Sequence, residues 1–89
     1  MRNFEIARLF YEMANLLEVR GESIFRIRAY QRGAQTLEAL AEDVGVLAER
    51  GALTSLPNIG KDLAAKIQEY LATSRIARLE FLREGLAPT

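Results

Sequence analysis

Apolar residues recur along most of this chain at the three- and four-residue spacing of an amphipathic helix. The first run predicts a helix over about residues 4–19, with Asn3 as its N-cap and Gly21 near its end. The apolar positions of this run are Ile6, Phe10, Met13 and Leu17. A second run predicts a helix that begins at Ser23 as N-cap and is broken by Asp43 and Gly45. Its apolar side comprises Ile27, Tyr30, Ala34, Leu37 and Ala41.

The second half of the chain predicts shorter elements. A short helix is expected over 44–50, a further helical turn over 52–55, and a helix from Gly60 to about Ala72. The last helix is marked by Ile76, Leu79 and Leu82. No segment alternates with the period of two that is typical of strands. We therefore expect an all-α fold, a compact bundle of four main helices plus one or two short ones. Residues 1–85 should form the domain, and residues 86–89 the start of a linker.

The segment from Leu56 to Ile67 combines a tight turn with the start of a helix. Pro57 fixes φ, and Asn58 and Gly60 are residue types that reach positive φ at low cost. Apolar residues flank the turn in the helix-hairpin-helix pattern, namely Leu53, Leu56, Leu63, Ala64 and Ile67. The first amides of the following helix lack intrahelical partners, and Lys61 adds a positive charge beside them. A DNA phosphate would fit there without regard to base sequence. The alternative is a helical corner that only packs.

Composition narrows the chemistry. The 89 residues make one small domain with 12 basic and 12 acidic residues, so the formal net charge is zero. This balance counts against binding nucleic acid through a broad basic surface, although Arg26, Arg28 and Arg32 cluster in one segment and Lys61 and Lys66 in another. Cysteine and histidine are absent, which excludes disulfides, the usual zinc sites and a histidine base. No apolar run reaches the length of a membrane span, and no signal peptide precedes the first helix, so we expect a cytoplasmic protein.

Two sets of side chains are candidates for contacts with DNA or for chemistry. Arg26 and Tyr30 share one side of the second predicted helix, as suits a terminal phosphate with a sugar or base beside it. Arg32 points the other way and is a further candidate for DNA binding. A buried tyrosine covered by an arginine stem is the alternative. Lys66 lies at the border of an apolar face, either as a solvated charge or as a nucleophile that forms a Schiff base as the neutral amine. Asp62, four residues earlier, opposes that neutral form.

Together these features resemble the N-terminal domain of family X DNA polymerases, the group that contains DNA polymerase beta. The stretches that carry the resemblance are Gly21 to Tyr30, with Phe-Arg-Ile-Arg-Ala-Tyr typical of the bacterial branch, then Leu56 to Ile67, Tyr70 to Thr73, and Leu79-Glu80. The resemblance implies a helical unit that binds the 5′-phosphate side of a gapped or nicked DNA in base excision repair. It also implies that the remaining polymerase domains follow in cis. We expect a monomer, associated with the bacterial nucleoid.

The resemblance also implies roles for individual residues. Lys66 falls on the nucleophile of a 5′-deoxyribose-phosphate lyase, which acts through a lysine Schiff base and β-elimination. Arg26 and Tyr30 fall on the 5′-phosphate pocket, whereas Asp62 and Thr54 replace basic residues, a change that bears on lyase activity. The hairpin of the family binds a monovalent cation, Na⁺ or K⁺, through main-chain carbonyls, here those of Thr54, Leu56 and Ile59. From the turn and the helix start, we expect the contacts of the hairpin with DNA at Asn58, Gly60 and Lys61.

The polymerase chemistry of the family is expected outside this chain. Two-metal nucleotidyl transfer with Mg²⁺ needs clustered carboxylates on a sheet, and this chain has only Asp43 and Asp62 as aspartates. We expect no further cofactor. Two alternatives stay open from the sequence, a helix-hairpin-helix clamp without catalysis and a helical bundle that binds another protein.

Overall fold

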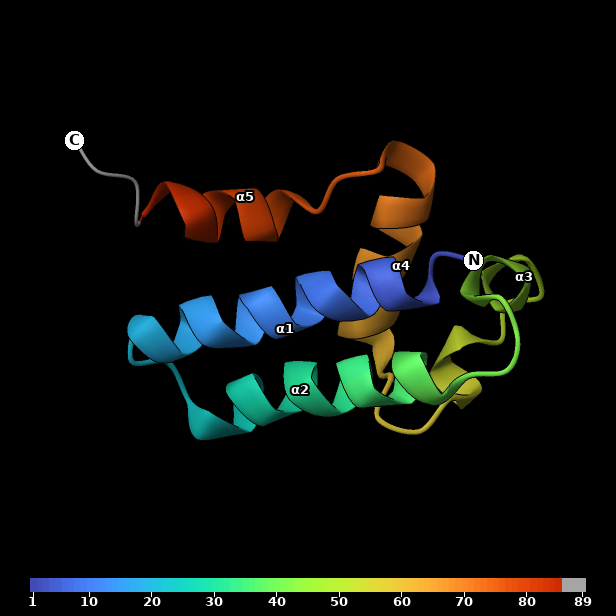
Figure 1. Cartoon of the computed structure of the whole chain (residues 1–89), viewed down its shortest axis with the longest axis horizontal. Helices are drawn as coiled ribbons and strands as arrows, with labels where there is room; N and C mark the ends of the chain where they lie inside the picture. Colours follow the sequence, from blue (N-terminus) through green and yellow to red (C-terminus); the bar gives the residue numbers. More distant parts are fainter. Residues whose placement is uncertain (86–89) are drawn as a thin grey trace.

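The structure is a computed structural model and describes residues 1–85, so the predicted linker at 86–89 lies outside the described residues. Its elements are α1 (Asn3–Val19), α2 (Ile24–Ala39), α3 (Val44–Glu49), the 3₁₀ turn η1 (Leu53–Ser55), α4 (Lys61–Thr73) and α5 (Ala77–Glu84). No strand occurs within residues 1–85. The all-α prediction is therefore confirmed, with four main helices, one short helix and one short turn (Figure 1).

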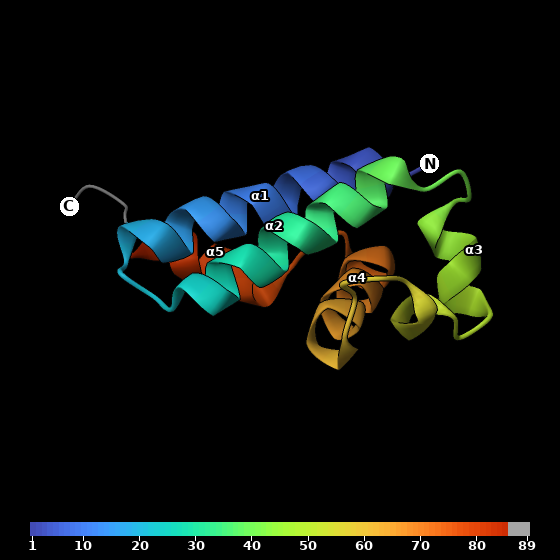
Figure 2. The same cartoon turned by 90° about the horizontal axis from the view of Figure 1, so that it is seen from below.

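Helices α1 and α2 lie side by side and antiparallel (Figures 1 and 2). The chain reverses after α1 because Gly21 adopts a positive φ of 73°. The amides of Gly21 and Glu22 then donate to the carbonyls of Glu18 and Leu17, both at 3.0 Å, which is a Schellman motif. Helix α2 begins as predicted, with the Ser23 hydroxyl accepting from the Phe25 amide at 3.2 Å. These local signals place the two longest helices.

Asn3 does not cap α1, contrary to the prediction. Arg2 occupies the N-cap position, and Asn3 is buried with 1% of its surface exposed. The side-chain nitrogen of Asn3 donates to the main-chain carbonyl of Glu42 at 2.7 Å, and the side-chain oxygen of Asn3 accepts from the Val44 amide at 2.9 Å. Asn3 therefore fastens the start of α1 to the start of α3, and burial is tolerated because both polar ends of its side chain are bonded.

The second helix is shorter than predicted. It ends at Ala39, and Ala41 is exposed beyond it. Asp43 acts as the N-cap of α3 through a bond from the Gly45 amide at 3.2 Å. The residues expected to break one helix thus begin the next.

The remaining helices close the core against α1 and α2. Helix α4 crosses this pair, and α5 lies along α1 (Figures 1 and 2). Arg83 holds α5 against α1 by a bidentate ion pair with Glu12, in which Nε and Nη2 donate to the two carboxylate oxygens at 2.6 and 2.7 Å. The largest fully buried side chains come from α1, α2, α3 and α4 and from the α4–α5 connection, and include Phe10, Ile6, Met13, Leu37, Ile67, Ile76 and Val44.

Candidate nucleic-acid interface

The hairpin consists of η1, a turn over 56–60 and the first turn of α4. Asn58 adopts a positive φ of 66°, as predicted for one of the two turn residues. Gly60 does not, because its φ of −85° and ψ of −172° are extended backbone that any residue adopts. The left-handed position of the turn therefore falls on asparagine, a residue type that tolerates it.

Backbone amides are exposed where α4 begins. The amides of Gly60, Lys61 and Asp62 donate no hydrogen bond to any described residue, whereas the Gly60 carbonyl accepts from the Ala64 amide at 2.9 Å. Gly60 is exposed, and a Cβ built on it would meet nothing within 4 Å. The side chain of Ile59 is buried beneath the turn. Free N–H groups with an open approach, at the positive end of a 13-residue helix, form an anion site of the kind that phosphates occupy.

A cavity of about 240 Å³ lies beside the hairpin, between four helices. Its lining is Met13, Leu17, Arg26, Tyr30, Asp62, Lys66, Arg78 and Leu82. The fold thus brings together the predicted residues of α2 (Arg26, Tyr30) and of α4 (Asp62, Lys66). Three of the lining side chains are cationic and one is a carboxylate, so the cavity carries net positive charge although the chain as a whole carries none. We call it the basic pocket.

Lys66 is recessed in the basic pocket, with 16% of its side chain exposed. Its Nζ donates to Asp62 Oδ1 at 2.8 Å, and the carboxylate is itself 73% exposed. Burial lowers the pKa of the Lys66 amine, but the hydrogen bond to Asp62, the hydroxyl of Tyr30 and the charge of the carboxylate together outweigh burial, so the pKa is raised. Lys66 is therefore a well-placed cation in the free protein, and Asp62 holds it in the protonated form.

Tyr30 forms a rigid wall of the basic pocket. Its ring contacts Phe10 edge to face, with centroids 5.6 Å apart and planes at 80°. Burial is the main cause that raises the pKa of its hydroxyl, and Lys66 opposes this increase. Tyr30 is therefore neutral at physiological pH and available as a hydrogen-bond donor at the edge of the pocket.

Two arginines complete the basic pocket. Arg26 is half-exposed and lies 3.6 Å from Glu22, a loose surface pair that solvent screens. Arg78 of α5 was missed by the sequence analysis. It makes no ion pair with any described residue and lies over the ring of Phe81, 5.5 Å from the ring centre. Arg78 lies four residues before Leu82, which places it at the edge of the apolar face of the last predicted helix, and this position could have indicated it as a candidate.

The other predicted residues lie outside the basic pocket. Asn58, Gly60 and Lys61 belong to the hairpin, and Arg32 is exposed on α2 away from the cavity. Lys61 and Thr54 line a separate hollow of about 270 Å³ on the flank of the hairpin. The candidate interface therefore has two parts, the hairpin and the basic pocket.

The three carbonyls expected to bind a monovalent cation surround the hairpin turn. Those of Thr54 and Ile59 accept no hydrogen bond from any described residue, and that of Leu56 accepts one from the Ile59 amide at 3.3 Å. Neutral oxygens with free lone pairs suit a weakly charged, hard cation. The donor set therefore fits Na⁺ or K⁺.

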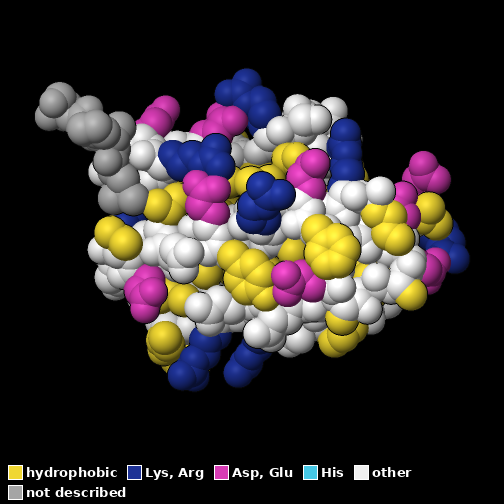
Figure 3. All heavy atoms as spheres, viewed as in Figure 1, with side chains coloured by type: hydrophobic (Ala, Val, Ile, Leu, Met, Phe, Trp, Pro, Cys, Tyr) yellow, Lys and Arg dark blue, Asp and Glu magenta, His cyan; other side chains and the backbone are white. Residues whose placement is uncertain are grey.

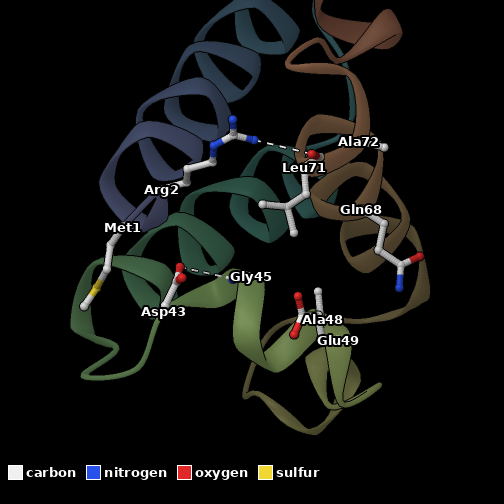
Figure 4. Close-up of a pocket in the computed structure, with 9 residues that line it drawn as sticks. All are labelled: Met1, Arg2, Asp43, Gly45, Ala48, Glu49, Gln68, Leu71 and Ala72. Atoms are coloured by element: carbon white, nitrogen blue, oxygen red, sulfur yellow. Dashed lines mark hydrogen bonds between the residues drawn. The ribbon is translucent and has the colours of Figure 1, made fainter.

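A larger hollow of about 640 Å³ lies at the N-terminal end of α1, between α3 and α4 (Figure 4). Asp43 and Glu49 line it, and its one cationic side chain, that of Arg2, donates to the Leu71 carbonyl at 3.4 Å. These carboxylates disfavour a phosphate. Size alone therefore does not mark the site, and the basic pocket fits an anion better.

Charge over the rest of the surface is mixed. Figure 3 shows Lys and Arg side chains interspersed with Asp and Glu on one face. Within residues 1–85, no group of three or more metal-ligating side chains comes together. The helices described here are also too short or too polar to span a membrane.

Comparison with known proteins identifies the family of the chain. The family described as a helix-hairpin-helix domain matches residues 1–76. The DNA polymerase/3′-5′ exonuclease PolX of Bacillus subtilis is 33% identical over 92 residues, a match that covers 99% of this chain. The chain spans 16% of the length of that relative. The predicted resemblance to family X polymerases is thereby confirmed.

Proposed function

Since the chain belongs to the helix-hairpin-helix domain family, we propose that it binds DNA at a gap or nick and holds the 5′-phosphate of the downstream strand. The observation that carries this proposal is the basic pocket, in which Arg26, Lys66 and Arg78 converge on one cavity. A phosphate dianion there would receive charge-assisted hydrogen bonds from several directions. The relative is a polymerase, which supports a role as the DNA-positioning part of such an enzyme, acting in base excision repair in the bacterial cytoplasm.

One DNA strand can engage both parts of the interface. Lys61 at the start of α4 and Lys66 in the basic pocket are five residues apart, which is about 7.5 Å along a helix. Successive phosphates of one strand advance about 3.4 Å along duplex DNA. The pocket would therefore hold the terminal phosphate while the exposed amides hold a nearby phosphate of the same strand.

The test compares gapped DNA with and without the 5′-phosphate. We expect about tenfold tighter binding of the phosphorylated DNA, because a charged group would be bonded in a partly buried site. Arg78→Ala should reduce this preference, while Arg32→Ala, a matched arginine outside the pocket, should leave it unchanged. Equal affinity for the two DNAs would contradict the pocket and leave a hairpin clamp. Absence of any salt-sensitive DNA binding would instead favour a protein-binding bundle.

A second candidate function is 5′-deoxyribose-phosphate lyase activity. The observation in its favour is the recessed amine of Lys66, 16% exposed and inside the basic pocket. Lys66 would attack the C1′ aldehyde of the sugar as a neutral amine and lose water to form a Schiff base. Loss of a C2′ proton to solvent would then break the C3′–O bond, so that the DNA strand leaves with its 5′-phosphate, and water would hydrolyse the remaining Schiff base to free the Lys66 amine. The bond to Asp62 opposes the neutral form, so the reaction would require the amine to be released from this carboxylate. Borohydride trapping on a 5′-deoxyribose-phosphate substrate tests the activity.

A monovalent cation at the hairpin would strengthen the first function. The carbonyls of Thr54, Leu56 and Ile59 would hold it, and its charge would add to that of the exposed amides facing a DNA phosphate. Replacement of K⁺ by tetramethylammonium at equal ionic strength should then weaken binding of duplex DNA. Unchanged affinity would exclude a contribution from the cation.

A further inference from the structure

Helix α2 contacts the hairpin turn directly. The Thr36 hydroxyl donates to the Pro57 carbonyl at 2.9 Å and accepts from the Asn58 side-chain nitrogen at 3.3 Å. These bonds join residues 21 and 22 positions apart in the sequence. One hydroxyl thus holds both residues at the centre of the turn.

The hydrogen bonds from Thr36 support a turn that contains a residue in an unfavourable backbone conformation. Asn58 is held at φ 66°, where a residue with a Cβ pays a cost that glycine does not. The Asn58 side chain is exposed, so its own packing contributes little. The hydrogen bond to Thr36 offsets part of the backbone cost and selects one orientation of the Pro57–Asn58 peptide.

The same face of α2 brings the hairpin close. Gly33, one helical turn before Thr36, is buried, and a Cβ built on it would lie 2.6 Å from Leu63 Cδ1 and 3.4 Å from Ile59 Cδ1. The missing side chain therefore lets the apolar residues around the turn approach the helix. Gly33 sets the distance between α2 and the hairpin, and Thr36 sets the conformation of the turn.

From these contacts we infer that Thr36 is a positioning residue for DNA binding: its hydroxyl fixes the Pro57–Asn58 peptide so that the amides of Gly60 and Lys61 face a DNA phosphate. This inference rests on the proposed function. It assigns to α2 a second task, because the same helix supplies Arg26 and Tyr30 to the basic pocket. Thr36 lies outside that pocket, so its effect is on the hairpin alone.

The test uses Thr36→Val, which keeps the shape of the side chain and removes the hydroxyl. We expect a three- to tenfold loss of affinity for gapped DNA, equal for DNA with and without the 5′-phosphate, because only the hairpin is affected. Thr36→Ser should keep the affinity of the unmodified chain. Since both hydrogen bonds are solvent-exposed, the melting temperature should change little.

A double-mutant cycle identifies the partner. In Asn58→Gly the backbone at position 58 adopts positive φ without support. The loss of DNA affinity caused by Thr36→Val should therefore be smaller in that background. Unchanged affinity of Thr36→Val, failure of Thr36→Ser to preserve binding, or loss confined to phosphorylated DNA would each overturn the inference. If the unmodified chain binds no DNA, the proposed function fails instead, and the two failures are thereby distinguished.

Discussion

The hairpin and the basic pocket lie next to each other but are built in different ways. The hairpin offers backbone amides from one continuous segment, and its shape depends on a proline, a left-handed asparagine and the start of a helix. The pocket offers side chains from four helices, and its positive charge exists only where α2, α4 and α5 meet. A backbone site tolerates changes of the side chains that carry its amides as long as the turn keeps its shape, whereas a side-chain site is altered by a single substitution of a lining residue. The presence of Asp62 in the pocket illustrates that second case.

The largest effect is expected when the amine of the basic pocket is removed. If the lyase proposal holds, Lys66→Ala should reduce borohydride trapping by about 100-fold or more, because loss of a nucleophile removes the covalent path. Lys61→Ala, a matched lysine of the hairpin, should trap nearly as well as the unmodified chain. Equal trapping by Lys66→Ala and the unmodified chain would show that Lys66 is not the nucleophile.

A substitution in α2 should disturb the packing of the hairpin. Gly33→Ala places a methyl group against Leu63 Cδ1 and should lower the free energy of unfolding by about 1–3 kcal/mol through overpacking. Chemical denaturation measures this loss. Gly45→Ala is the control, since its Cβ would lie no closer than 3.6 Å to any neighbouring atom. Equal stability of the two variants would show that the hairpin can move away from α2 at no cost.

Removal of the Asp62 carboxylate should make the Lys66 amine more reactive. Asp62→Asn takes away a hydrogen bond and a negative charge that raise the pKa of Lys66, so this pKa should fall. The trapping rate near neutral pH should then rise about 2–5-fold, an effect kept small by the solvent exposure of Asp62. The pH profile of trapping should shift to lower pH. Glu22→Gln removes the carboxylate beside Arg26 instead and should not shift that profile; a shift in both variants would exclude a specific effect of Asp62.

The smallest effect is expected away from both sites, where α5 is held on α1. Arg83 lowers the pKa of Glu12 through its hydrogen bonds, against the opposing effect of burial. A lowered pKa in the folded state gives stability that is present above the unfolded pKa and lost as pH falls through the folded one. Glu12→Gln should therefore cost about 0.5–1 kcal/mol near pH 7 and nothing in strong acid. Glu18 makes no ion pair with any residue between 1 and 85, so Glu18→Gln is the control in thermal denaturation. An equal cost in that variant would contradict the assignment.

Most of the fold could be predicted because its signals are local. Spacing of apolar residues located the main helices, the Ser23 cap was found in place, and Gly21 ended α1 as expected. Asn3 shows the limit of such reasoning. It is a good cap by residue type, but its side chain is used by a segment about forty residues away, a demand that no local pattern records.

The sequence by itself determined where the hairpin lies, because Pro57, Asn58 and the orphan amides of a helix start belong to one short segment. The bonds from Thr36 that hold the turn came from the tertiary structure. Only the tertiary structure decided the basic pocket. Arg78 entered it from α5, and Asp62 came to hold Lys66 in a recess shared with Tyr30. The physical reason is that backbone preferences act over a few neighbouring residues, whereas the burial of a side chain and the charges around it depend on which helices pack together.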